Sequence, residues 1–261
     1  MSRNKLVELR KAIRSNIKTV IDYISLNHIF RGNNISTYVP ATTICMFCGS
    51  CSNNITKEHV IPRWIFEKDP HKFFDITLNG QSQTYNKTTV PACQRCNGEL
   101  LSSLEYYVKE LFRTVDLDNN RFSVDELQNL IRWLEIIDYK FQIVNITKKF
   151  LSPKNGQHIP YLKDFPLYML LPNRNYSPSQ VKSNIRQALR RISIKNKQRH
   201  LNSLVVFKTS NRGFHFFHTI NDFIFLELPQ FGIALFYFYI KTFEDENDCH
   251  KEAMKIIDEV Y

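Results

Sequence analysis

Apolar residues recur every three or four positions in five stretches of the chain, and this spacing predicts five amphipathic helices. The stretches cover residues 4–27, 98–115, 124–143, 179–193 and 249–260. Ser123 and Glu126 form a capping box, which marks the start of the third helix. The first helix suits either the protein's own core or a homodimer contact, because part of a heptad is formed by Leu6, Leu9, Ile13 and Val20.

A second pattern fills the region before the last helix, where short apolar and aromatic runs alternate with turn residues. The runs cover residues 203–209, 214–219, 223–228 and 232–239. We expect four antiparallel strands in a meander, each paired with the next. Five prolines between residues 148 and 178 predict a loop or a short edge strand there. Helices and strands in this order indicate an α+β fold.

Four of the six cysteines form two C-x-x-C pairs, the spacing of a tetrahedral zinc site with four thiolate ligands. They are Cys45, Cys48, Cys93 and Cys96. Cys51 offers an alternative first pair, because Cys48-Gly49-Ser50-Cys51 has the same spacing. We call each C-x-x-C pair a knuckle, and we prefer Cys45 and Cys48 as the first one. Gly49 then directly follows this knuckle, where a positive φ is useful.

The opening residues and the apolar runs favour a cytoplasmic protein. No signal peptide opens the chain, and the longest apolar run, 233–240, is too short to cross a membrane. We therefore expect reduced cysteines that are available to a metal, and no membrane partner.

The charge balance favours nucleic acid as a partner. Lysine and arginine number 35 against 25 acidic residues, a net charge of +10. Residues 181–215 carry nine basic side chains and no acidic one. Lys182, Arg186 and Arg190 follow one another at four-residue spacing, which predicts a basic ridge on one helix, suited to phosphates. The acidic segment 244–259 suits a basic regulatory protein or the chain's own ridge.

The segment between the cysteine pairs carries Lys57-Glu58-His59-Val60-Ile61-Pro62, and Asn97 directly follows the last cysteine. This arrangement resembles the HNH, or ββα-metal, nuclease family, and within it the zinc-bearing branch of phage recombination endonuclease VII. The resemblance covers about residues 44–112. It implies a zinc-held ββα core at 40–115. Outside this core, the patterns described above predict an N-terminal helix and loop at 1–39 and an α+β region at 116–261 that could bind substrate or a partner.

The resemblance also implies metal-dependent hydrolysis of phosphodiester bonds, with DNA as the expected substrate. His59 would activate the attacking water, and Glu58 and Asn97 would bind a catalytic Mg²⁺ or Mn²⁺. Two features depart from the family pattern. The carboxylate is a glutamate instead of the commoner aspartate, and the middle asparagine has no clear match. Asn86 is retained as a candidate catalytic residue, although Thr88 lies closer to the usual place.

Two further residues have roles that the sequence leaves open. Arg63 could reach a phosphate or remain solvated, and Glu105 could support the metal or be a surface carboxylate. The same motifs also fit a non-catalytic zinc-knuckle protein that binds nucleic acid, or a nuclease that acts on RNA. HNH proteins of this size include effectors of bacterial defence, which is an analogy with the family alone.

Overall fold

The computed structural model describes most of the 261-residue chain. The described residues are 3–29, 43–51, 54–67, 75–78, 81–84, 88–116, 122–147, 178–212 and 215–260. Asn86 and almost all of the proline-rich segment, 148–177, lie outside these ranges. The same is true of 30–42, which covers most of the predicted first loop.

All five predicted helices are present. They are α1 (Arg3–Ile24), α2 (Ser102–Thr114), α3 (Val124–Thr147), α4 (Pro178–Ser193) and α5 (Glu246–Val260). Wider helical turns extend α1 as η1 (Ser25–Ile29) and precede α2 as η4 (Arg95–Leu101). The capping box at the start of α3 is confirmed. The Ser123 backbone N–H donates to Glu126 Oε2 at 2.7 Å, and the Glu126 N–H donates to Ser123 Oγ at 3.3 Å.

The strands form three antiparallel sheets. In the first, β1 (Ile55–His59) pairs with β4 (Thr89–Cys93), and in the second, β2 (Asp75–Leu78) pairs with β3 (Gln81–Thr84). The third contains β5 (Leu204–Lys208), β6 (Phe216–Thr219), β7 (Phe223–Leu228) and β8 (Ile233–Phe238). Short helical turns η2 (Arg63–Phe66), η6 (Gln198–Ser203) and η7 (Pro229–Phe231) connect these elements.

The third sheet confirms the predicted antiparallel strands but corrects the predicted order. The strands lie in the order β5-β8-β7-β6, so only β6, β7 and β8 form a meander, and β5 pairs with β8. Every residue of β7 and β8 is buried, whereas β5 ends at the exposed Lys208. Two strands that are apolar on both faces need central positions, and this leaves β5 at an edge.

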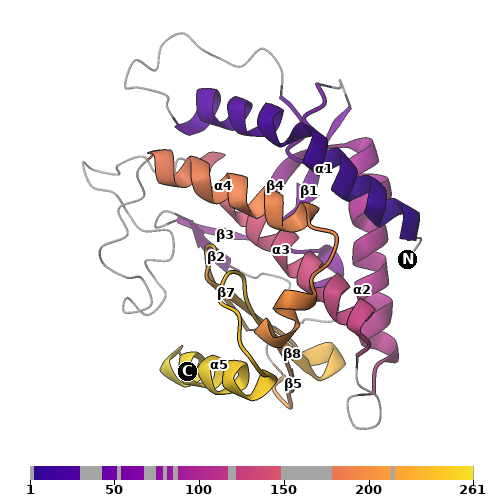
Figure 1. Cartoon of the computed structure of the whole chain (residues 1–261), viewed down its shortest axis with the longest axis vertical. Coiled ribbons are helices and arrows are strands. Elements are labelled where there is room, and N and C mark those ends of the chain that lie inside the picture. Colours follow the sequence, from indigo (N-terminus) through magenta and orange to yellow (C-terminus); the bar gives the residue numbers. More distant parts are fainter. Residues whose placement is uncertain are drawn as a thin grey trace.

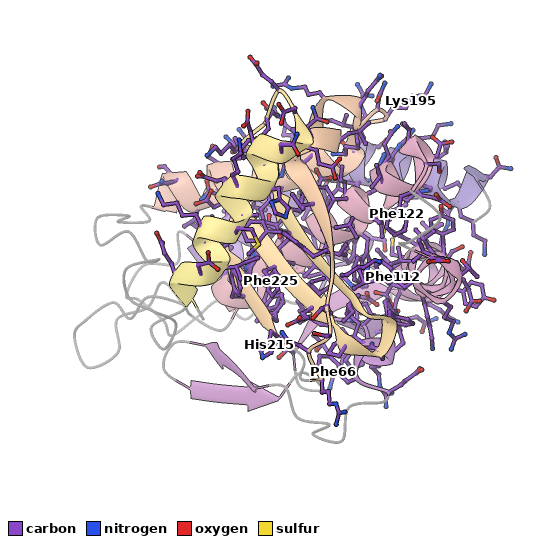
Figure 2. All side chains as sticks on the ribbon, turned by 90° about the horizontal axis from the view of Figure 1, so that it is seen from below. Phe66, Phe112, Phe122, Lys195, His215 and Phe225 are labelled. Carbon is purple, nitrogen blue, oxygen red and sulfur yellow. The ribbon has the colours of Figure 1, made fainter. Side chains whose placement is uncertain are left out.

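Helices cover both faces of this sheet (Figure 1, Figure 2). On one face, Phe225 and Phe236 pack with Cys249 and Ala253 of α5, which lies across the strands. Cys249 is fully buried there, as expected of a small apolar side chain. The other face belongs to the main core, where Tyr237 and its neighbours meet α3.

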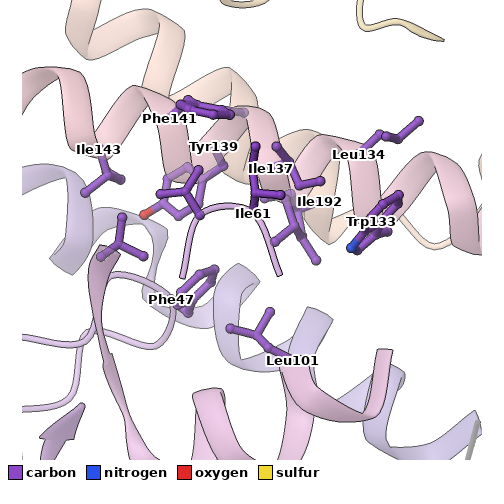
Figure 3. Close-up of a cluster of buried hydrophobic side chains, with 14 of the residues drawn as sticks. Phe47, Ile61, Leu101, Trp133, Leu134, Ile137, Tyr139, Phe141, Ile143 and Ile192 are labelled. Atoms are coloured by element: carbon purple, nitrogen blue, oxygen red, sulfur yellow. The ribbon is translucent and has the colours of Figure 1, made fainter. Parts of the chain in front are cut away.

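Helix α3 is the centre of the molecule. Every residue from 130 to 144 is buried, and α1, α2 and α4 lie around it (Figure 1). Figure 3 shows Tyr139 and Ile137 of α3 facing Phe47, Ile61 and Leu101 of the cysteine-bearing region. Burial of one such apolar side chain contributes about 1.5–3 kcal/mol. This helix therefore joins the first sheet to the C-terminal one.

Charged side chains of α3 are buried along with the apolar ones. Glu135 Oε2 lies 2.7 Å from Lys197 Nζ. The two carboxylate oxygens of Asp138 have separate partners: Oδ2 lies 2.7 Å from Nη2 of Arg191 in α4, and Oδ1 lies 2.9 Å from Nε2 of His218 in β6. Buried charges are tolerated only when they are paired and hydrogen-bonded, and these are. None of the described helices combines the length and the apolar composition that a membrane span requires.

Candidate functional site

The four predicted cysteine ligands meet in space. The sulfur atoms of Cys45, Cys48, Cys93 and Cys96 all lie within 4.8 Å of one another. Cys48 Sγ and Cys93 Sγ, which are 45 residues apart in sequence, are separated by 3.7 Å. Cys51 is exposed and does not belong to this group. Four sulfurs at this separation could bind a structural zinc ion.

The backbone of the first knuckle explains the glycine that follows it. Gly49 has a φ of +69°, and its N–H donates to the carbonyl of Cys45 at 2.9 Å. A β carbon at position 49 would lie 3.1 Å from Cγ2 of Thr19 in α1. Glycine therefore satisfies both the turn and the close approach of α1. In the second knuckle, the Cys96 N–H points at Cys93 Sγ, at 3.5 Å.

The acidity of the thiols also fits a cation at this place. Hydrogen bonding with Cys45 and Cys96 holds the pKa of Cys48 far below its usual range. The hydrogen bond with Cys48, together with burial, raises the pKa of Cys45 to about 11, although the contact with Cys96 opposes this shift. Hydrogen bonding with Cys45 and Cys48, together with burial, raises the pKa of Cys96 strongly. Without a cation, thiolates held this close together repel one another. A dication would offset that repulsion and allow the remaining thiols to ionise, which is the chemistry of thiolate zinc sites.

The first knuckle is held against the strand pair and against α3. The Met46 N–H donates to Pro91 O of β4 at 3.0 Å, and the Tyr139 hydroxyl donates to Met46 O. Ile55 at the start of β1 is opposite Cys93 at the end of β4. The cysteine cluster therefore lies where the strand pair meets the helix that follows.

Glu58 and His59 lie at the other end of the strand pair, opposite Val90 and Thr89. The Glu58 side chain is buried, and its carboxylate accepts a hydrogen bond from Nζ of Lys140. This ammonium also donates to the carbonyl of His59 at 2.8 Å and to Glu105 Oε1 at 3.3 Å. A lysine of α3 thus reaches into the predicted reactive centre.

The His59 side chain is half-buried. Its burial and the positive charge of Arg63 lower the pKa of the imidazole; Glu58 opposes this and Lys140 reinforces it. The ring is therefore neutral at pH 7, the state that a general base requires. Arg63 itself is exposed at the start of η2, four residues after His59.

Asn97 lies in η4 and turns its amide toward β1. Its Nδ2 donates to Thr56 Oγ1 at 2.8 Å. Thr56 and Glu58 are two residues apart in a strand, so their side chains project from the same face. The structure thus brings Asn97 to the face of β1 that carries Glu58.

This arrangement does not fit a divalent cation at Oε1 of the Glu58 carboxylate. That oxygen, Oε1, is bound to the Lys140 ammonium, and the Asn97 amide nitrogen is bound to Thr56. The binding of Mg²⁺ or Mn²⁺ by Glu58 and Asn97 stays a prediction. Glu105 is partly buried beside the same lysine. Its burial raises the pKa to about 7, although Lys140 opposes the shift.

The predicted basic ridge lies on α4, which packs beside α1 (Figure 1). Arg186 and Arg190 are exposed and Lys182 is half-buried, whereas the adjacent Arg191 turns inward to Asp138. The ridge is therefore a surface feature that a nucleic acid could reach.

Lys140 is a residue of this site that the sequence pattern did not reveal. The helical spacing of α3 predicted an apolar stripe and did not single out its charges. The signal was available, because apolar residues lie on every side of this helix between Leu130 and Val144. A helix that is apolar all round is buried, and its charged residues must then find partners.

Comparison with known proteins adds no relative: no family model, no curated protein and no solved structure matches this chain.

Proposed function

We propose that this protein is an endonuclease of the HNH type that hydrolyses phosphodiester bonds in DNA. The observation that carries the proposal is the half-buried imidazole of His59 at the end of a strand pair whose other end carries four clustered cysteines. Burial lowers the pKa of this imidazole, which favours its neutral form. Asn97, on the helical segment that follows β4, donates to Thr56, which projects from the same face of β1 as Glu58. Arg63, four residues beyond His59, is exposed and available to a phosphate.

His59 has the properties that the proposal requires of it. A neutral imidazole can take a proton from water as the water attacks phosphorus. Lys140 holds the backbone of the strand that carries this side chain, because its ammonium donates to the His59 carbonyl. The departing oxygen would then leave from the opposite side of the phosphorus. Bacterial defence is a setting that the family analogy offers for such an activity.

Replacement of His59 by alanine should reduce the rate of plasmid cleavage about 10²- to 10⁴-fold. The assay compares both proteins with Mg²⁺, with Mn²⁺ and without metal, on plasmid DNA, duplex RNA and single-stranded RNA. Because the pKa of His59 is lowered, wild-type cleavage should persist at pH 6.5 and decline only at lower pH.

The matched control is His250→Ala, since His250 is an exposed histidine on α5. This variant should cleave at the wild-type rate. Equal cleavage by wild type and His59→Ala, or no cleavage of any of the substrates, would contradict the proposal. Cleavage of RNA but not of DNA would support the alternative that the protein is a nuclease that acts on RNA.

A non-catalytic nucleic-acid-binding protein is the second candidate, because the Glu58 carboxylate is already bound to Lys140. A carboxylate that forms a buried ion pair can stabilise the fold around the zinc knuckles without taking part in catalysis. This candidate predicts salt-dependent binding and no cleavage under any metal condition.

Both candidates predict that the α4 ridge contacts phosphates. Reversal of Arg186 and Arg190 to glutamate should weaken binding to a DNA duplex and reduce the slope of log affinity against log salt by about 2. Fluorescence anisotropy over a range of salt concentrations measures both quantities. The control reverses two exposed lysines of α5, Lys251 and Lys255, and should leave the slope unchanged. Equal slopes for wild type and the α4 variant would exclude this ridge from the interface.

A further inference from the structure

Lys140 lies at the centre of an oxygen cluster contributed by two elements. Its three acceptors are Glu58 Oε1 and the His59 carbonyl from β1, and Glu105 Oε1 from α2. The lysine side chain is only 1% exposed. An ammonium has three N–H donors, and this cluster offers one acceptor to each.

The same three groups have the chemistry of a site for a hard cation. Mg²⁺ and Mn²⁺ prefer carboxylate and carbonyl oxygens, and the cluster supplies two carboxylates and one carbonyl. A divalent ion that shared Glu58 Oε1 with the ammonium would meet a positive charge at close range. The two cations therefore exclude each other at this oxygen.

We propose that the Lys140 ammonium takes the place of a divalent cation at Glu58. In this view Glu58 binds the lysine instead of a metal, and loss of the ammonium uncovers a metal site formed by Glu58, Glu105 and the His59 carbonyl. Lys140 is then a positioning residue, because it holds the strand that carries His59. The inference concerns the residues of the proposed nuclease but rests only on the contacts of Lys140.

The test measures Mn²⁺ binding to the zinc-loaded protein by electron paramagnetic resonance, without any cleavage. Wild-type protein and Glu58→Gln should bind Mn²⁺ with equal affinity. Lys140→Met, which removes the charge and keeps most of the length of the side chain, should bind Mn²⁺ about tenfold or more tightly than wild type, because a repelling positive charge is removed. Adding Glu58→Gln to Lys140→Met should abolish that gain. A purely structural ion pair would not produce such a gain.

A tenfold weaker Mn²⁺ affinity of Glu58→Gln relative to wild type would overturn the proposal, since Glu58 would then be a metal ligand in the native protein. A folded Lys140→Met variant with no gain in affinity would also overturn it. Should Lys140→Met fail to fold, the comparison of wild type with Glu58→Gln decides, and equal affinities support the proposal. Because no outcome depends on hydrolysis, failure of the nuclease assay leaves this test unaffected.

Discussion

Replacement of Cys96 by serine is expected to release the bound zinc and to unfold the β1–β4 strand pair. The strand pair is short, and sulfurs from both knuckles meet at its cysteine end, where a zinc ion would hold them together. Zinc binding to small structural sites of this kind contributes about 10–16 kcal/mol near neutral pH, and that free energy is folding free energy. Elemental analysis should find one zinc ion per wild-type chain and none in the variant, and circular dichroism should show the accompanying loss of structure.

Cys51→Ser is the matched control, because Cys51 lies three residues after Cys48 but is exposed and outside the sulfur cluster. This variant should retain zinc and the wild-type stability. A chelator added to wild-type protein should reproduce the Cys96→Ser result. If purified wild type contains no zinc, or if Cys96→Ser and Cys51→Ser behave alike, the cysteine cluster is not a metal site.

The four cysteine ligands could be predicted because each C-x-x-C pair can be recognised from a few neighbouring residues. Each knuckle is a four-residue pattern, and the positive φ of Gly49 follows from the turn itself. The helices were predictable for a similar reason, since an amphipathic pattern repeats within each one. The capping box at Ser123 and Glu126 is another signal that a few neighbouring residues contain in full.

What the sequence left unpredicted depends on contacts between distant segments. Lys140 and Glu58 are 82 residues apart, and no periodicity reports their pairing. The pairing of β5 with β8 likewise reflects which strands must be buried on both faces. The site of Asn97 was predictable only in part. Its position after Cys96 is local information, but its hydrogen bond to Thr56, 41 residues away, is not.

The buried charges of α3 lead to the second large effect: Asp138→Ala should destabilise the fold by about 3–5 kcal/mol. The Asp138 carboxylate is fully buried and accepts hydrogen bonds from Arg191 and His218 and from Gln142 Nε2 at 2.7 Å. Its removal leaves the buried guanidinium of Arg191 without its counter-charge. Urea denaturation at pH 7 measures the change in the free energy of unfolding.

The control is Glu252→Ala, which removes the carboxylate of an exposed ion pair with Lys241. A pair of this kind contributes about 0.2–1 kcal/mol, so the two variants should differ several-fold. Comparable losses from Asp138→Ala and Glu252→Ala would show that the buried network does not hold α3, α4 and the sheet together.

The same carboxylate should give the protein a specific sensitivity to acid. Burial opposes ionisation of Asp138, but the hydrogen bond to His218 and the charge of Arg191 outweigh it and lower the pKa below the ordinary value of 3.8. A carboxyl whose pKa is lower in the folded state stabilises the fold above its unfolded pKa and loses that contribution as the pH falls through the folded value. The stability difference between wild type and Asp138→Ala should therefore be full at pH 5 and shrink below pH 3.8. A difference that stays constant down to the acid transition would mean that the charge of Asp138 contributes nothing, and that the variant is destabilised by lost packing alone.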